Sequence, residues 1–359
     1  MAVTRILVEA TLWETRAAAF SAGAPVALFH ESPLCPRGPR LGAVHTVTLR
    51  EAPRGLDGGF CETAGGEPVY VRFGKAPRPA LGSKLDVVIV AEARPGKSAR
   101  ARALNTEGDT PAGANALEAW ATHLRFAGDL EDAATPGERE EIDAAFAAAL
   151  APKVTLEGGG RLIFARTEAV FTIDVDSGGR DTRADRKRGA QSLNQTALSA
   201  AGAQLALRGI GGLGVIDCVA PISKRGGSAL KAAFLEAFRS VSPRKAAALA
   251  PSPFGLLEVS LAWAECPIGD VLGHETGLRP GAAEPAPIAT LLDGLRGVER
   301  ELRRAPAAEV VLRLPEGAFA EADARPGGLA ALASAIRGHY GASIKVEPSP
   351  TGRLDVVRR

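Results

Sequence analysis

Apolar runs of different lengths divide the first hundred residues into predicted strands. Two runs, residues 4–11 and 15–30, predict strands joined through a turn at Gly23. A Pro- and Gly-rich break covers residues 33–42, and residues 94–116 resemble a loop and linker. Between these breaks lie short strand-like runs that suit a small β-barrel, at residues 43–50, 59–63, 68–73 and 84–92.

The middle of the chain alternates between helix and strand patterns. A short helix is predicted at residues 117–126, and the capping-box sequence from Thr135 to Glu138 predicts a helix that ends near residue 150. A strand–turn–strand pattern follows at residues 153–165, and we expect residues 4–30 to pair with it. The order strand, helix, strand, helix, strand then predicts an α/β layer, with its elements at residues 168–175, 189–207, 212–217, 228–241 and 254–260.

A smaller α+β unit is predicted at the end of the chain. Residues 264–287 are rich in loop-forming residues, and helical spacing resumes after them. The predicted helices span residues 288–303 and 327–338, and the predicted strands span residues 309–314, 342–347 and 353–358.

The amino-acid composition indicates the class of protein but says little about its function. A hydrophobic content of 46% indicates a globular chain. No run of about 18 apolar residues is present, so no membrane span is expected. The first 16 residues include acidic side chains where a signal peptide has an apolar run, which favours a cytoplasmic protein. The net charge of +2 and the aromatic content of 5% neither require nor exclude nucleic-acid binding.

The cysteines do not form a metal-binding pattern. Cys35, Cys61, Cys218 and Cys266 are far apart, and none belongs to a C-x-x-C pair. We therefore expect free thiols and no zinc.

Acidic residues at the ends of two apolar strands carry the clearest chemical signal. Asp174 and Asp176 precede the glycines at 178 and 179, and Asp217 ends the next predicted strand. Ligand sites of open α/β sheets lie at the carboxyl ends of strands. Clustered carboxylates suit Mg²⁺, which can polarise a phosphodiester. The alternative is that these side chains only cap turns at strand ends.

Three stretches resemble the catalytic part of the bacterial ribonuclease E/G family. They are RTEAVFTIDVDSGG, NQTALSAAGAQLALRGIGGLGVID and PFGLLEVS, in the order and spacing of the family pattern. The resemblance implies that Asp174 and Asp217 bind a catalytic Mg²⁺. It also places Asp176 where the family has an Asn that orients the scissile phosphate or the attacking water. An Asp cannot donate as Asn does, so Asp176 would act as a third metal ligand or weaken catalysis.

The resemblance also implies a domain plan. An OB-fold RNA-binding module at residues 36–103 would be inserted into an RNase H-like subdomain, with residues 104–116 as a linker. A DNase I-like α/β catalytic subdomain, a second linker and a small C-terminal α+β domain would follow. The RNase H-like part would comprise residues 1–35 and 117–166, and the later parts residues 167–263, 264–287 and 288–359.

The same resemblance suggests residues that contact RNA. Phe60 and Tyr70 match two aromatic residues that stack on bases, and Lys97 matches a lysine that contacts phosphate. The alternative for the two aromatic side chains is barrel core. Basic candidates near the acidic strand ends are Arg180, Arg183, Lys224, Arg244 and Lys245. A solvated turn is the alternative for Arg180 and Arg183.

Two features of the family are missing from the pattern. The interval between about 104 and 130 is too short for the domain that senses a 5′-monophosphate. Cys266 stands without the second cysteine of the family's zinc link. A homodimer, if formed, would thus not be linked through zinc.

These observations favour a Mg²⁺-dependent endoribonuclease that acts on single-stranded RNA. A non-catalytic RNA-binding protein with the same fold is the main alternative. A DNA nuclease or another phosphoesterase is a third, because the metal chemistry is shared.

Overall fold

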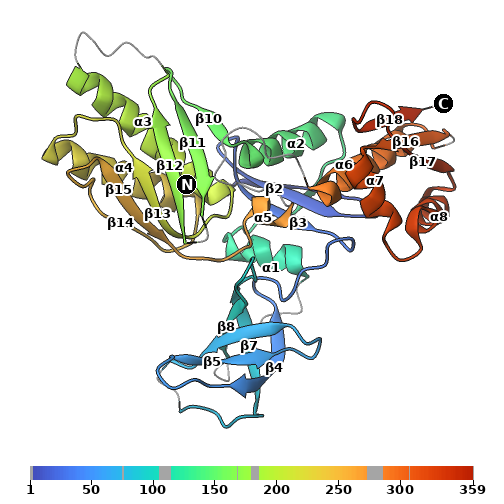
Figure 1. Cartoon of the computed structure of the whole chain (residues 1–359), viewed down its shortest axis with the longest axis horizontal. Helices are drawn as coiled ribbons and strands as arrows, with labels where there is room; N and C mark the ends of the chain where they lie inside the picture. Colours follow the sequence, from blue (N-terminus) through green and yellow to red (C-terminus); the bar gives the residue numbers. More distant parts are fainter. Residues whose placement is uncertain are drawn as a thin grey trace.

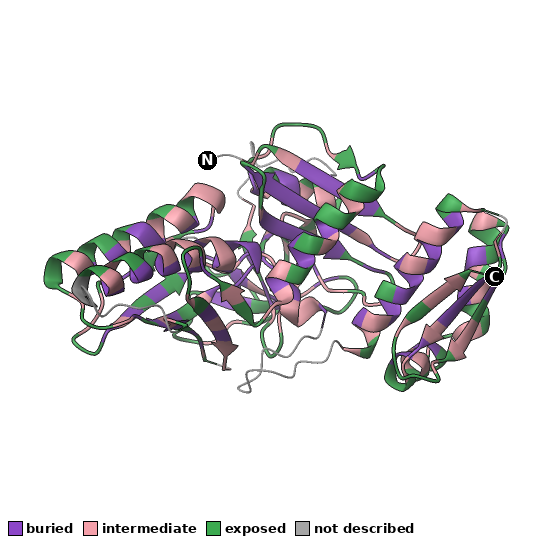
Figure 2. Cartoon of the chain, turned by 90° about the horizontal axis from the view of Figure 1, so that it is seen from above, coloured by how far each residue is buried: buried purple, intermediate pink, exposed green. Residues whose placement is uncertain are grey.

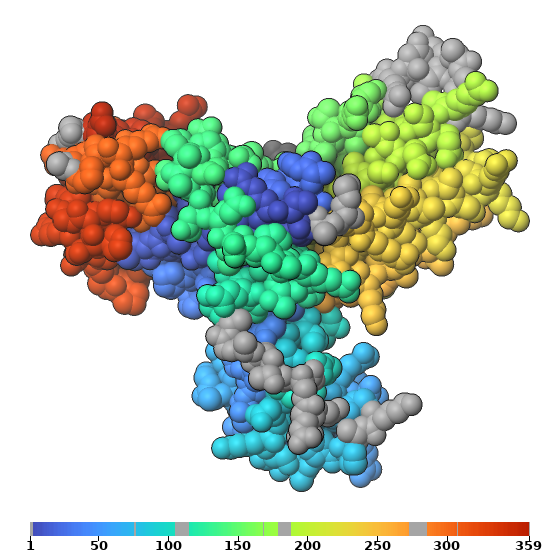
Figure 3. Space-filling model, turned by 180° about the vertical axis from the view of Figure 1, so that it is seen from behind, coloured from blue at the N-terminus to red at the C-terminus, as the bar shows by residue number. Residues whose placement is uncertain are grey.

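Three β-sheets and one closed barrel organise the molecule (Figure 1). The computed structural model describes residues 3–74, 77–104, 115–167, 169–178, 186–272, 286–306 and 308–358, without the side chains of residues 186 and 187. A central sheet carries the barrel on one side, and two further lobes extend in opposite directions. Figure 3 shows the barrel as a separate protrusion below these lobes.

The first sheet is buried on both faces. Its strands are β1 (Arg5–Ala10), β2 (Thr15–Ser21), β3 (Ala24–Glu31) and β9 (Glu131–Asp132), in the order β3-β2-β1-β9. Helix α1 (Ala116–His123) packs on one face, and α2 (Pro136–Leu150) with α5 (Ile268–Val271) packs on the other. Burial on both faces explains why β1 and β2 are nearly continuous apolar runs rather than alternating ones.

The expected pairing of residues 4–30 with residues 153–165 is wrong. Strands β10 (Lys153–Thr155) and β11 (Arg161–Arg166) belong to a different, six-stranded sheet. The N-terminal strands pair among themselves and with β9. The capping box at Thr135 is confirmed, since its side chain accepts from the Glu138 N–H and the Glu138 carboxylate accepts from the Thr135 N–H.

The second unit is a closed five-stranded barrel, consistent with an OB-like fold. Its strands are β4 (Val44–Glu51), β5 (Gly58–Glu62), β6 (Pro68–Arg72), β7 (Lys84–Ala91) and β8 (Ala99–Ala103), in the order β4-β5-β6-β8-β7. Strand β8 lies in the stretch 94–116 that was expected to be loop, so that expectation is wrong there. Its sequence, ARARA, places alanines in the core and arginines outside, and alanines give only a weak strand signal.

The third unit is a six-stranded sheet covered by helices on one face. Its order is β10-β11-β12-β13-β15-β14, with β12 (Val170–Asp176), β13 (Gly212–Asp217), β14 (Ala246–Ala248) and β15 (Leu256–Leu261). Helices α3 (Arg186–Leu207) and α4 (Lys224–Val241) cover one face and form its core. Alternate residues of β12 and β15 are exposed, so these strands have one buried and one open face (Figure 2).

The last unit is a three-stranded sheet packed against helices. Strands β16 (Val310–Leu314), β17 (Ile344–Pro348) and β18 (Asp355–Arg358) pack on α6 (Pro287–Arg304), α7 (Glu316–Asp323) and α8 (Gly328–Tyr340). Helix α7 was not expected from the sequence. Its eight residues, EGAFAEAD, are too few for a helical repeat to be evident.

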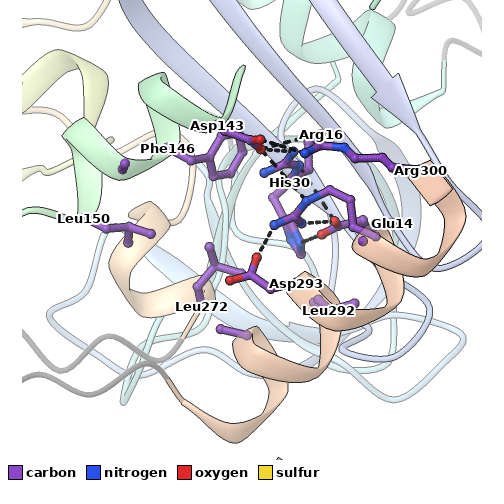
Figure 4. Close-up of a pocket in the computed structure, with 14 residues that line it drawn as sticks. Glu14, Arg16, His30, Asp143, Phe146, Leu150, Leu272, Leu292, Asp293 and Arg300 are labelled. Atoms are coloured by element: carbon purple, nitrogen blue, oxygen red, sulfur yellow. Dashed lines mark hydrogen bonds and ion pairs between the residues drawn. The ribbon is translucent and has the colours of Figure 1, made fainter. Parts of the chain in front are cut away.

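A cluster of buried charges joins the first sheet and α2 to α6 (Figure 4). Arg16 donates to Glu9 at 2.6 Å and to Asp143 at 2.7 Å, and Arg300 reaches the same two carboxylates at 2.7 Å. Arg296 pairs with Glu14 and Asp293, and Glu14 also contacts His30 at 3.1 Å. Buried charges are tolerated when they are paired in this way.

Opposing effects set the protonation of Glu14. Burial by itself would raise the pKa of Glu14, but the charges of Arg296 and Arg16 and a hydrogen bond from His30 lower it to about 2. Burial lowers the pKa of His30, so its ring is neutral at neutral pH. The contribution of Glu14 to stability is therefore present above its ordinary pKa of 4.5 and is lost as the pH falls toward 2.

We predict that Arg296→Met destabilises the protein by about 3–5 kcal/mol, because it leaves the Glu14 carboxylate buried without its nearest cation. Loss of that cation also raises the pKa of Glu14, so acid unfolding should begin at a higher pH than in the wild type. Urea unfolding at pH 7 and an acid titration measure both effects. The control is Arg313→Met, which removes a more exposed ion pair with Glu347 and should cost at most about 1 kcal/mol. Equal losses in both variants would contradict the prediction.

Candidate active site

The open face of the six-stranded sheet brings two carboxylates together. Strands β12 and β13 are parallel neighbours, and Asp174 is the register partner of Asp217. Both side chains are exposed, since the helices cover the other face of the sheet. In a parallel pair, register partners lie side by side on the same face. The structure thus places the two acidic strand ends next to each other.

The electrostatics of Asp174 reflect this proximity. Partial burial raises the pKa of Asp174, and the charges of Asp217 and Asp176 raise it further, while Arg161 opposes them. The ionised form of Asp174 is therefore disfavoured by its surroundings. A cation bound between the two carboxylates would relieve that repulsion, so the donor set and its charge suit a divalent metal such as Mg²⁺.

Asp176 has a different environment from its two neighbours. Its Oδ2 accepts from Arg161 at 2.6 and 2.7 Å, and its Oδ1 accepts from the Gly178 N–H at 2.9 Å. The Gly178 hydrogen bond and the Arg161 contact lower the pKa of Asp176. Both carboxylate oxygens are thus occupied by partners from the protein. The two alternatives for Asp176, a third metal ligand or a residue that weakens catalysis, stay predictions.

The hairpin between β10 and β11 fixes Arg161 beside Asp176. The two residues are register partners on antiparallel strands, and the hairpin turns at Gly158–Gly160 as expected. Gly160 has a φ of +88°, and a Cβ there would lie 2.9 Å from the main-chain oxygen of Asp176. Gly160 therefore permits the close approach that the Arg161–Asp176 pair needs.

A buried amide holds the loop that follows Asp217. Asn194 of α3 is fully buried, its Nδ2 donates to the Val219 carbonyl at 2.8 Å, and its Oδ1 accepts from the Val219 N–H at 2.9 Å. The Cys218 N–H donates to the Gly255 carbonyl at 3.2 Å. These bonds tie the residues after β13 to both α3 and the β14–β15 turn. Sequence reasoning missed this role of Asn194, although a polar residue on the buried face of a helix is a recognisable signal.

We predict that Asn194→Ala lowers the free energy of unfolding by about 1–3 kcal/mol, because it leaves the Val219 N–H and C=O without partners. The matched control is Gln195→Ala, which changes the exposed neighbour on the same helix and should have little effect. Chemical denaturation of the three proteins measures the difference. An Asn194→Ala variant as stable as the control would show that water replaces the amide.

Comparison with known sequences bears on this same segment. The sequence profile described as the Ribonuclease E/G family matches residues 127–262, which contain both Asp174 and Asp217. Residues 127–262 are thus similar to the ribonuclease E/G family. A protein named Ribonuclease E from Nostoc sp. (strain PCC 7120) is 33% identical over 161 residues. That alignment covers 41% of this chain and 23% of the Nostoc protein, so this chain matches less than a quarter of the relative's length.

The basic residues proposed near the acidic strand ends divide into three groups. Lys224 is exposed at the first turn of α4, and Lys245 is exposed beside β14. Arg180 and Arg183 lie outside the described residues. The expectation that Arg244 contacts RNA is not supported, because its side chain is buried. Its guanidinium donates to the carbonyls of Ile210 at 2.9 Å and Leu205 at 3.0 Å.

The two aromatic residues of the barrel lie on its outer surface and not in its core. Phe60 on β5 and Tyr70 on β6 are register partners, with ring centroids 5.3 Å apart in an edge-to-face arrangement. Phe60 is 39% exposed, and neither ring belongs to the barrel core. Lys97 is exposed two residues before Ala99, which pairs with β6 at Val69. The barrel therefore presents an aromatic pair with a lysine nearby.

A cleft lies between Tyr70 of this aromatic pair and the end of the six-stranded sheet. It has a volume of about 1070 Å³. Its barrel side includes Tyr70 and three exposed arginines, and its other side includes Lys245 and Trp263; the arginines are Arg72, Arg100 and Arg102. Burial and the charge of Arg72 lower the pKa of Arg100, as expected for clustered cations. Arg100 and Arg102 were missed because β8 was expected to be loop, although the alternation in ARARA places them on one face.

The cysteines of the chain are free, and burial keeps their thiols protonated. Burial raises the pKa of Cys61 to about 11 and, with the charge of Asp217, that of Cys218 to about 12. The pKa of Cys266 is likewise raised to about 12, chiefly by burial. Within the described ranges no group of three or more His, Cys, Asp or Glu side chains is arranged to hold a metal. None of the described helices is long and apolar enough to cross a membrane.

Proposed function

We propose that this chain is a Mg²⁺-dependent endoribonuclease that hydrolyses single-stranded RNA in RNA processing or decay. The observation that carries the proposal is the side-by-side placement of Asp174 and Asp217 on the open sheet face, within the segment that matches the ribonuclease E/G family. The name of the Nostoc relative supports the same class of activity. The family plan also suggests the finer domain reading, in which the six-stranded sheet is the DNase I-like part and the N-terminal sheet with α2 is the RNase H-like part. Strands β10 and β11, which were expected in the RNase H-like part, pair within the six-stranded sheet.

The two carboxylates would hold Mg²⁺, and the metal would supply Lewis-acid polarisation of the scissile phosphodiester. The residues around them would bind and orient the RNA. Arg161 adds a cation beside the pair, and its charge is compensated by Asp176 in the absence of RNA. Lys224, which follows β13, would contact phosphate near the acidic pair, and Lys245 would contact phosphate at the opposite end of β15, beside the cleft.

The barrel would supply most of the affinity for RNA. Phe60 and Tyr70 offer ring faces to bases, and the arginines of the cleft offer phosphate contacts. From the end of β15 beside the cleft to Leu256 opposite Asp217, the strand covers about 17 Å. A single strand that leaves the barrel could therefore cross the open sheet face and reach the acidic pair.

We predict that Asp174→Asn and Asp217→Asn each lower kcat for single-stranded RNA by about 10²-fold or more, because each removes a metal-binding charge. RNA affinity in EDTA should change little, since the barrel and the basic residues remain. The melting temperature of Asp174→Asn should stay equal or rise, because the fold disfavours the ionised form of that residue. Cleavage of a labelled RNA with Mg²⁺ or EDTA and filter binding measure these effects, with a DNA strand as a parallel substrate.

Asp176→Asn is the variant to compare with Asp174→Asn and Asp217→Asn, because it restores the residue of the family pattern. The asparagine keeps an acceptor for the Gly178 N–H but releases the Arg161 guanidinium toward bound phosphate. We expect equal or higher activity. A wild type that binds RNA but never cleaves it would favour the non-catalytic RNA-binding alternative, and cleavage gained only in Asp176→Asn would identify a silenced ribonuclease. Cleavage at the wild-type rate by all three variants would exclude this site.

We predict that Phe60→Ala and Tyr70→Ala each weaken binding of single-stranded RNA by about 1–3 kcal/mol, because each removes a ring that stacks on a base. Leu81→Ala is the control, since Leu81 is an exposed apolar side chain of the barrel region without a ring, at 67% exposure. Fluorescence anisotropy with a short labelled RNA in EDTA separates binding from cleavage. Equal affinity of the Phe60 and Leu81 variants would remove the barrel surface from the RNA-binding site.

A further inference from the structure

The exposed large apolar side chains are confined to two parts of the described molecule. Five belong to the barrel region and three to the six-stranded sheet with its turns. They are Val44, Leu56, Phe60, Leu81 and Val90 in the barrel region, and Leu213, Leu249 and Phe254 in the sheet. Phe254 is the most exposed of them at 87%, and no core cluster includes it. The function proposed above does not use this ring.

The turn that carries Phe254 is held in place by its own hydrogen bonds. Ser252 N–H donates to the Leu256 carbonyl at 2.9 Å, Gly255 N–H donates to the Ser252 carbonyl at 2.9 Å, and the Phe254 N–H donates to the Ser252 hydroxyl at 3.3 Å. Prolines at 251 and 253 restrict the backbone further. Gly255 has a φ of +87°, a conformation that a side chain would strain. The backbone that carries the exposed ring is therefore fixed before any ligand binds.

That turn lies at the same end of the sheet as the acidic pair. Leu256 is the register partner of Asp217, and the Gly255 carbonyl accepts from the N–H of Cys218, the residue after Asp217. Phe254 is two residues from Leu256, so their Cα atoms are at most about 7 Å apart. Phe254 thus lies in the turn at the strand end that carries Asp217, and Asp174 is on the next strand.

We propose that Phe254 is a base-stacking residue that positions the nucleotide next to the scissile phosphate. This inference rests on the function proposed above. A ring that folding leaves in water gains stability when a base covers it, and stacking tolerates any base. Together with the stacking residues of the barrel, Phe254 would keep the RNA extended across the acidic pair. It would then determine which phosphate lies over Asp174 and Asp217.

The test uses short single-stranded RNAs that carry 2-aminopurine at one position at a time, bound in EDTA so that no cleavage occurs. Stacking on an aromatic ring quenches this base. We expect one position next to the cleavage site to be quenched by the wild type and by Phe254→Tyr, but not by Phe254→Ala or Phe254→Leu. With Mg²⁺, Phe254→Ala should raise KM by about 5- to 150-fold, the range for one stacked base. Removal of that base from the RNA should weaken the wild type equally and have no further effect on Phe254→Ala.

Leu249→Ala is the matched control, because Leu249 is 60% exposed beside the neighbouring strand β14 and has no ring. Unchanged melting temperatures of all variants exclude a folding defect. The inference is overturned if Phe254→Ala matches the wild type at every position while Phe60→Ala weakens binding, a result that leaves the proposed function intact. It is also overturned if Phe254→Ala changes the sedimentation mass and not the RNA contacts. If the wild type binds no RNA at all, the proposed function and the inference both fail.

Discussion

The parallel pairing of β12 with β13 is the constraint on which the candidate site depends. It places Asp174 directly beside Asp217, and a shift of one residue in either strand would turn one carboxylate into the covered face. The apolar residues that alternate with the acidic ones prevent that shift. They are Ile173, Val175 and Ile216, and they fill the core under α3 and α4. One alternation of residues therefore determines both features: the apolar side chains fill the core on the covered face of the sheet, and the acidic side chains lie on the open face.

Buried polar groups then fix the parts around that pairing. Asn194 satisfies both main-chain groups of Val219, and Arg244 satisfies carbonyls near the end of α3. The cluster of Arg16, Arg296 and Arg300 with their carboxylates joins the N-terminal sheet to α6. None of these side chains was assigned a structural role from the sequence. Burying a charge or an amide without a partner destabilises the fold by more free energy than a paired group contributes. Such groups therefore select one arrangement of the chain more than they add to its stability.

The sequence predicted local features well and long-range pairing poorly. The capping box at Thr135 and the α3 and α4 helices follow from local spacing, and the acidic ends of β12 and β13 follow from the strand pattern. Strand β8 was missed because its inward residues are alanines, which bury too little apolar surface to give a strong strand signal. The partner of the N-terminal strands was predicted wrongly because the apolar runs at 4–11 and 15–30 contain nothing that selects a partner strand. Arg244 was misread because an exposed and a buried arginine look alike until the partners of the guanidinium are known.

Asp176 shows how the neighbours of a residue determine its chemical role. From the sequence, an aspartate where the family has asparagine is either a third ligand or an excess negative charge. The structure pairs it with Arg161, the residue opposite it on β11, so the substitution and its neutralising cation belong to the same hairpin. The Asp176–Arg161 pair is therefore neutral as a whole, whereas a neutral side chain in place of Asp176 would leave the positive charge of Arg161 uncompensated. The difference from asparagine is that the guanidinium of Arg161 is already engaged, and a phosphate must compete with Asp176 for it. In the proposed function, the substitution would therefore change how firmly an RNA phosphate is held by Arg161 beside the acidic pair.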